Sequence, residues 1–135
     1  MGLGMADLVV EIGQAFLIDT PPNGEHLYIA IALIGDGRYL FVNVTTRRAS
    51  SETTCILDPR TPGLPSFINR ESVVAYQYAR AWSPEELSRV IKPGSRVPKC
   101  IFSDEIVSRI QNSGLISKRL SNQFKTALKI FLNQK

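Results

Sequence analysis

The chain has 135 residues, 44% of them hydrophobic, and a formal net charge of +4. A chain of this length builds one domain with a substantial core and is too short for two such domains. Its longest apolar run, Leu27 to Ile34, is far shorter than the roughly 20 residues that cross a bilayer, and residues 1–13 lack the features of a secretory signal. These features argue against a membrane-spanning helix, and we expect a cytoplasmic protein with no membrane partner.

The charge is divided unevenly along the chain. Residues 1–88 contain 6 Lys and Arg against 10 Asp and Glu, whereas residues 89–135 contain 10 against 2. A basic block of this kind often faces a polyanion such as a nucleic acid. Lysine and arginine side chains also solvate the outer faces of amphipathic helices, so the charge by itself leaves both interpretations open.

The first strands are expected in the N-terminal half. "QAFLID" (14–19) is predicted to be a strand that ends at the loop "TPPNG" (20–24), because prolines and glycine interrupt regular structure. "HLYIAIAL" (26–33) and "RYLFVNVT" (38–45) are predicted to pair as a β-hairpin around the turn "IGDG".

The first strand of this hairpin is expected to be covered on both faces. Its apolar side chains fall into two alternating sets, as in a strand buried on both sides. Tyr28 and two alanines are expected on one face. The other face is expected to carry Leu27, Ile29, Ile31 and Leu33.

Two further strands and two capped helices follow. Strands are predicted at "TTCIL" (53–57) and "SVVAYQYAR" (72–80). "SPEEL" places Ser83 at a helix N-cap with Glu86 three residues later, which is a capping box. A second helix is predicted from the cap Ser103 to a C-terminal stop at Gly114.

A basic amphipathic helix is predicted from Ser117 to the C-terminal region. Leu120, Phe124, Leu128 and Phe131 recur at helical spacing, while lysines occupy the other faces. No aromatic belt or lipidation motif accompanies this helix. We therefore expect its apolar stripe to dock on the sheet and not on a membrane.

Short strands followed by helices predict a mainly β protein with C-terminal helices. The expected architecture is a small SH3-like partial barrel of about five antiparallel strands, closed by two or three helices. We expect a single domain over residues 1–135, with the barrel strands in 13–82 and the helical part in 83–135.

Several short motifs resemble the PemK/MazF toxin family. "GQAFLIDTPPNGEH" is similar to the opening strand and loop of that family, and "LYIAIAL" and "FVNVTTRR" are similar to its two next strands. Weaker similarity continues through "FINRESVVAYQYARAWSPEELSRVI", so that the resemblance spans residues 13–91. It consists of short, degenerate motifs.

The resemblance implies a metal-independent endoribonuclease that cleaves single-stranded RNA, acts as a homodimer and is inhibited by an antitoxin protein. Such enzymes use an arginine after the Gly-Glu loop and a threonine at the end of a later strand. Thr45 and Thr46 match the threonine position. The arginine position is occupied by His26 and Leu27, and this departure leaves a catalytically silent binding module on the same barrel as the alternative.

The residue types at the two hairpin ends suit RNA cleavage. The reaction needs a group that takes the 2′-OH proton and donors that stabilise charge on the phosphate. An imidazole exchanges protons at neutral pH, and antiparallel pairing brings the start of one strand beside the end of the next. His26, Thr45 and Thr46 are therefore the candidate catalytic residues.

Basic residues are the candidate ligands of RNA phosphates, and Glu25 is a candidate support of the preceding loop. Glu25 could pair with one of the adjacent arginines or simply end the loop. The arginines also have an ordinary structural interpretation as solvated charges, and Thr45 and Thr46 as β-branched strand formers. The candidate phosphate ligands are Arg47, Arg48, Lys118 and Arg119.

The remaining chemistry-bearing residues are expected to have structural roles. Cys55 and Cys100 have no neighbouring Cys or His at metal-ligand spacing, so we assign them no chemistry and expect no metal or cofactor. Tyr28, Tyr39 and Phe41 could stack on unpaired bases, but strand aromatics more often belong to the core.

Overall fold

The computed structural model describes residues 8–19, 24–92, 94 and 97–134. Residues 1–7 of the N-terminal segment that was examined for a secretory signal lie outside the described residues, and so do residues 20–23 of the loop "TPPNG". The described part of the chain contains six strands and three helices. In chain order they are β1 Gln14–Asp19, β2 Glu25–Gly35, β3 Arg38–Thr46, β4 Ile56–Leu57, β5 Ser72–Trp82, α1 Pro84–Val90, β6 Cys100–Ile101, α2 Asp104–Ile116 and α3 Asn122–Asn133.

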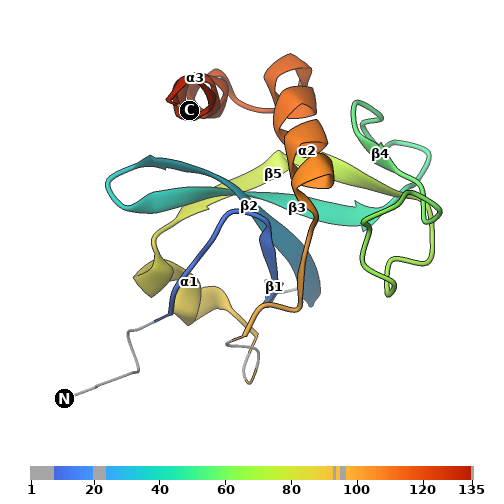
Figure 1. Cartoon of the computed structure of the whole chain (residues 1–135), viewed down its shortest axis with the longest axis horizontal. Helices are drawn as coiled ribbons and strands as arrows, with labels where there is room; N and C mark the ends of the chain where they lie inside the picture. The colour runs from blue at the N-terminus through green and yellow to red at the C-terminus, as the bar shows by residue number, and fades with distance from the viewer. Residues whose placement is uncertain (1–7, 20–23, 93, 95–96, 135) are drawn as a thin grey trace.

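The strands form one antiparallel sheet in the order β4-β5-β3-β2-β1-β6. Figure 1 shows this sheet strongly curled into a half-barrel, with α2 and α3 on one side and α1 on the other. The register shifts within the β2–β3 and β3–β5 pairs, and such bulges increase the local bend and twist of a sheet. The predicted mainly β fold with C-terminal helices is confirmed.

The central hairpin is confirmed. β2 ends at Gly35 and β3 begins at Arg38, so Asp36 and Gly37 form a two-residue turn. Their φ angles are 53° and 70°. Positive φ at both positions is what a type I′ turn requires, and Asp-Gly is one of the residue pairs that adopt it most readily.

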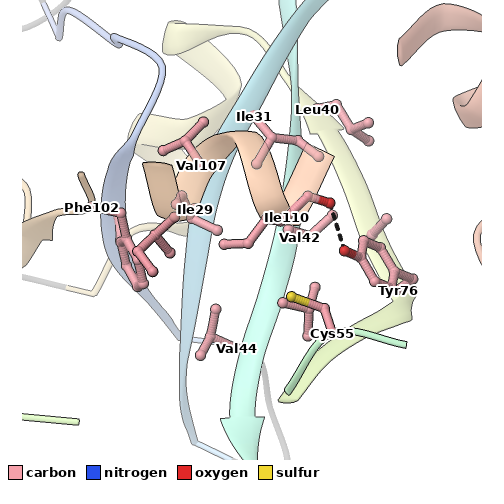
Figure 2. Close-up of a cluster of buried hydrophobic side chains, with 14 of the residues drawn as sticks. Ile29, Ile31, Leu40, Val42, Val44, Cys55, Tyr76, Phe102, Val107 and Ile110 are labelled. Atoms are coloured by element: carbon pink, nitrogen blue, oxygen red, sulfur yellow. Dashed lines mark hydrogen bonds between the residues drawn. The ribbon is translucent and has the colours of Figure 1, made fainter. Parts of the chain in front are cut away.

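The sheet has a hydrophobic cluster on each face. The first cluster lies between the sheet and helices α2 and α3, where Ile29 and Val42 pack against Ile110 (Figure 2). The second cluster lies on the opposite face, where Phe16 and the α1 residue Leu87 are buried. The prediction that β2 is covered on both sides is therefore confirmed for its central residues.

The alternation along β2 breaks at a bulge. Ala30 pairs with Phe41 and Ala32 pairs with Leu40, so β2 has one extra residue at Ile31. Ile31 and Ala32 consequently belong to the same cluster. The expected burial of Leu33 is wrong, because beyond the bulge this side chain is 45% exposed.

The aromatic side chains of β2 and β3 belong to the second cluster. Tyr28 and Phe41 are buried, and Tyr39 packs against the same cluster. Trp82 covers two of these rings, with its centroid 5.3 Å from each of the centroids of Tyr28 and Phe41. Tyr28 and Phe41 are therefore not available to stack on RNA bases, which supports their interpretation as core residues.

The predicted capping box of α1 is confirmed. The Glu86 N–H donates to Ser83 Oγ at 3.1 Å, and the Ser83 N–H donates to Glu86 Oε1 at 2.9 Å. Arg38 at the start of β3 donates two hydrogen bonds to the same carboxylate, at 2.8 and 2.9 Å. Glu86 thus joins the start of α1 to the central hairpin.

This arrangement predicts acid-sensitive stability. The hydrogen bonds from Arg38 and from the Ser83 backbone lower the pKa of Glu86 from 4.5 to about 2. Because the pKa is lower in the folded state, the contribution of Glu86 is present above pH 4.5 and is lost as the pH falls towards about 2. We expect the stability advantage of the wild type over Glu86→Gln in urea unfolding to shrink between pH 6 and pH 2.5.

A matched control for this measurement is Glu105→Gln. Glu105 is an exposed glutamate in the first turn of α2, with no ion pair within the part of the chain that the structure describes. An equal pH response of the two variants would contradict the role given to the Arg38–Glu86 pair.

The boundaries of α2 and α3 differ from those predicted. Ser103 caps α2 as expected, but Gly114 does not end the helix, which continues to Ile116. Gly114 lies where α2 meets α3 and the sheet, and a Cβ added there would be 3.2 Å from both Leu128 Cδ2 and Tyr76 Cε1. The glycine thus permits close packing and does not stop the helix.

The C-terminal helix starts later than predicted. Ser117 is the C-cap of α2, whereas α3 begins at Asn122 behind its own cap, Ser121. Leu128 is completely buried in the first cluster, with Phe124 and Phe131 packed around it. The predicted docking of the apolar stripe on the protein is therefore confirmed.

Two short edge strands also differ from prediction. Only Ile56 and Leu57 of the predicted strand 53–57 pair with β5. The strand β6 was not predicted; it lies inside the segment expected to be helical and pairs with β1. Strands of two residues carry too little periodicity to be read from sequence.

Among the described residues, none of the helices is long and apolar enough to cross a membrane.

Candidate functional site

The start of β2 and the end of β3 meet at one end of the sheet. Leu27 pairs with Val44 across β2 and β3, so that His26 comes next to Thr45 as the antiparallel register continues. On its other side His26 pairs with Ile18 of β1. The two ends of the hairpin that carry the predicted catalytic residues are thus adjacent.

A hollow of about 280 Å³ lies at these strand ends, and we call it the strand-end hollow. In Figure 1 the green segment between β3 and β5 lies beside the end of β3, and its last residues form the other wall of this hollow. The polar residues and the exposed aromatic residue that line it are Glu25, His26, Thr45, Thr46, Phe67, Asn69, Arg70 and Ser72.

The two predicted threonines lie on opposite faces of the sheet. Successive strand residues alternate in direction, and Leu27 and Tyr28 belong to the first and second clusters, respectively. His26 therefore lies on the face of the second cluster, together with Thr45 opposite it in register. Thr46 lies on the other face, so the two hydroxyl groups are not equivalent partners of the imidazole.

The His26 imidazole is available for chemistry. The residue is partly exposed, and no hydrogen bond or ion pair to its side chain exists within residues 8–19, 24–92, 94 and 97–134. A structural histidine normally donates or accepts at least one hydrogen bond when it is buried. No described residue therefore occupies either ring nitrogen.

The two predicted phosphate ligands after β3 differ in their environment. Arg47 donates to Glu71 Oε1 at 2.9 Å, so its charge is already paired. The Arg48 backbone N–H donates to Ser51 Oγ at 2.8 Å, while its guanidinium has no partner in the described part of the chain. Both residues line a second hollow of about 510 Å³, the arginine hollow, which Thr46 shares.

Arg70 is a site residue that the sequence analysis missed. It is exposed, lines both the strand-end hollow and the arginine hollow, and its guanidinium makes no hydrogen bond or ion pair to a described residue. The available sequence signal was its position two residues before Ser72, the first residue of β5. That signal is weak, because the loop conformation decides where the side chain lies.

Glu25 pairs with neither of the arginines proposed for it. Its carboxylate forms an ion pair with Lys92, which follows α1. The Lys92 N–H also donates to the Leu17 carbonyl at 2.9 Å. Glu25 therefore fixes the start of β2 to the segment after α1.

Arg119 and Lys118 lie in the turn between α2 and α3 and not on a helix. Arg119 donates to the Ser50 carbonyl at 3.3 Å, so its charge lies beside the segment that carries Arg48. Lys118 is exposed and lines none of the described hollows. Neither residue lines the strand-end hollow or the arginine hollow, but Arg119 contacts the segment that carries Arg48.

A buried polar link holds the arginine-bearing segment in place. Ser117 Oγ donates to Glu52 Oε2 at 2.5 Å, and Thr54 Oγ1 donates to the same atom at 2.7 Å. The other oxygen, Glu52 Oε1, is buried and has no hydrogen-bond partner among the described residues. The segment 47–54 is thereby anchored to the turn between α2 and α3.

The two thiols are protonated at neutral pH. Burial raises the pKa of Cys55, and burial raises the pKa of Cys100 to about 11. Both cysteines are free, and no group of three or more metal-ligating His, Cys, Asp or Glu residues occurs within the described residues. Neither cysteine lines the strand-end hollow.

Comparison with protein-family models and with curated proteins found no match to this chain. The curled sheet and the groups that its strand ends bring together are therefore the features from which we infer a function.

Proposed function

We propose that the protein is a metal-independent endoribonuclease that cleaves single-stranded RNA through the 2′-OH, as the resemblance to PemK/MazF toxins implies. The observation that carries this proposal is the strand-end hollow. It is lined by His26, by Thr45 opposite it and by Arg70, and neither the imidazole nor the guanidinium has a partner among the described residues. These are a proton acceptor, a hydrogen-bond donor and a cation, the three kinds of group that the reaction needs.

In the proposed reaction, neutral His26 takes the proton of the 2′-OH while the 2′ oxygen forms a bond to phosphorus. The bond from phosphorus to the 5′ oxygen breaks, and that oxygen takes a proton from water; the hydroxide that remains takes the proton from the His26 imidazolium, which returns the base to its starting form. Thr45 and Arg70 donate hydrogen bonds to the non-bridging phosphate oxygens, whose charge increases in the transition state. The products are a 2′,3′-cyclic phosphate and a 5′-hydroxyl end.

The departure from the family motif is compensated in this proposal by Arg70. The family places an arginine where this chain has His26 and Leu27. Arg70 supplies a guanidinium to the same hollow from the loop before β5. The charge is thus provided by a different segment, and the strand position becomes free for the imidazole.

The first test is incubation of the purified protein with a long defined RNA in the presence of EDTA. We expect discrete cuts whose 5′ ends carry a hydroxyl group. Bound but intact RNA would instead favour the silent binding module. The affinity of the protein for RNA should then fall steeply as the salt concentration rises, because phosphate contacts release counterions. A complex that salt does not weaken would indicate a protein partner.

Arg70→Ala is expected to lower the rate of cleavage about 100-fold, since loss of one charged donor at a phosphoryl site typically has an effect of this size. The measurement is single-turnover cleavage at saturating protein. Arg60→Ala is the matched control, because Arg60 is an exposed arginine paired with Asp58 that lines none of the described hollows. Equal rates for both variants would remove Arg70 from the mechanism.

The proposal also includes a homodimer and an antitoxin whose disordered segment folds on binding. The molecular mass of the purified protein, measured by analytical ultracentrifugation, tests the homodimer. Co-expression with the product of a neighbouring gene tests the second, and we expect that product to suppress RNA cleavage.

A further inference from the structure

Three hollows meet at Thr46. Besides the strand-end hollow and the arginine hollow, a third hollow of about 190 Å³ lies beside β5, and we call it the edge hollow. Thr46 lines all three, and Arg48 lines both the arginine hollow and the edge hollow. Because they share these residues, the three hollows adjoin one another at the end of β3, and we call them together the groove.

An exposed aromatic ring lies at one end of this groove. Phe67 lines the strand-end hollow and is 42% exposed. The next residue, Ile68, is buried in the first cluster, and its N–H donates to the Pro65 carbonyl at 3.0 Å. The backbone beside Phe67 is thus anchored, and the Lys99 Nζ lies 5.3 Å from the ring centroid. Lys99 occupies one face of the ring, and an exposed aromatic ring is a surface on which a nucleobase can stack.

A second exposed aromatic ring lies at the other end. Tyr78 lines the edge hollow and is 52% exposed. Its carbonyl accepts hydrogen bonds from the Tyr28 hydroxyl and from Arg80, both at 3.2 Å. The backbone that carries this ring is therefore also held in place, although β4 pairs with β5 only at Ser72 and Val73.

The charges between the two rings favour a polyanion. Arg48 and Arg70 have no ion-pair partner within the described ranges, and Arg119 adds a charge beside Ser50. Three carboxylates line the same hollows, and two of them are paired, Glu25 with Lys92 and Glu71 with Arg47. The third, Glu52, is buried and accepts hydrogen bonds from Ser117 and Thr54.

We propose that this groove holds an extended RNA strand with one base stacked on Phe67, a second base stacked on Tyr78, and the intervening phosphates bound by Arg70 and Arg48. The inference rests on the proposed RNA substrate and assigns its base-binding subsites. Single-stranded RNA exposes the faces of its bases, whereas a duplex hides them in its own stack. The groove therefore selects single strands through stacking.

The test uses a 2′-O-methyl RNA octamer that contains 2-aminopurine, because this strand has no free 2′-OH and its binding is measured independently of cleavage. Stacking quenches 2-aminopurine fluorescence. We expect Phe67→Leu and Tyr78→Leu each to weaken binding about 10-fold and to reduce the quenching, as loss of one base–aromatic stack does. Phe67→Tyr and Tyr78→Phe keep a ring and should retain the wild-type affinity.

Ile130→Ala is the matched control for removal of an exposed apolar side chain, since Ile130 is 55% exposed on α3 and lines none of the described hollows. Wild-type affinity in both leucine variants would overturn the inference, as would equal affinity for a duplex of the same sequence, or no binding of the octamer by folded wild type. Ring-dependent binding without cleavage of ordinary RNA would support the subsites and contradict the proposed ribonuclease.

Discussion

Replacing His26 by alanine is expected to lower the rate of RNA cleavage about 100-fold or more, because a positioned general base typically contributes a factor of this size. His26 is the single histidine of the chain, so no second imidazole can replace it. The affinity for the 2′-O-methyl octamer should change little, since the phosphate contacts are assigned to arginines. Single-turnover cleavage in EDTA and the octamer titration measure the two quantities separately.

The threonines provide an internal comparison for this prediction. Thr45 lies opposite His26 on the same face of the sheet, whereas Thr46 faces the other side. Thr45→Val should therefore slow the chemical step more than Thr46→Val, with both variants folded. Cleavage by His26→Ala at the wild-type rate would show that His26 is not the general base. Equal effects of the two threonine variants would contradict the placement of Thr45 and Thr46 on opposite faces of the sheet.

The second large effect is expected for stability. Ser117 is completely buried, and its Oγ donates to Glu52 while accepting the N–H groups of Arg119 and Leu120 at 3.0 and 3.1 Å. Ser117→Ala removes three hydrogen bonds and leaves polar groups without partners in a buried place. We expect the free energy of unfolding to fall by about 3 kcal/mol, measured by urea denaturation followed by circular dichroism.

Ser108→Ala is the control for this substitution. Ser108 is an exposed serine on the same helix with no side-chain hydrogen bond to a described residue, and exposed substitutions typically stay within about 0.5 kcal/mol of the wild type. A Ser117→Ala protein as stable as the control would show that the buried link to Glu52 contributes nothing. Because this link anchors segment 47–54, we also expect weaker octamer binding by the variant.

Local signals predicted the central hairpin and the N-terminal caps of α1 and α2 correctly. The Asp-Gly turn needs two residues with positive φ, and the capping box of Ser83 and Glu86 satisfies N–H groups within the same turn of the helix. Such features depend on residues a few positions apart. They can therefore be inferred without knowledge of the rest of the fold.

Errors arose where distant segments pack together. Gly114 was predicted to end a helix because glycine often follows the last helical residue. The structure shows that a glycine is needed there because Tyr76 and Leu128 pack closely against it. Leu33 was expected in the core because simple alternation was continued through a bulge at Ile31. The bulge depends on how β2 pairs with β3, and no local pattern revealed it.

The fold class, the hairpin that carries His26 and Thr45, and the basic character of the C-terminal third could be inferred before folding was considered, because periodicity, turn residues and charge are local properties. The groups that lie along the groove became apparent only in the folded chain. Arg70, Phe67 and Tyr78 reach the groove from a loop and a strand edge distant in sequence. Their positions follow from sheet curvature and loop packing, which are sums of many weak contacts between remote residues.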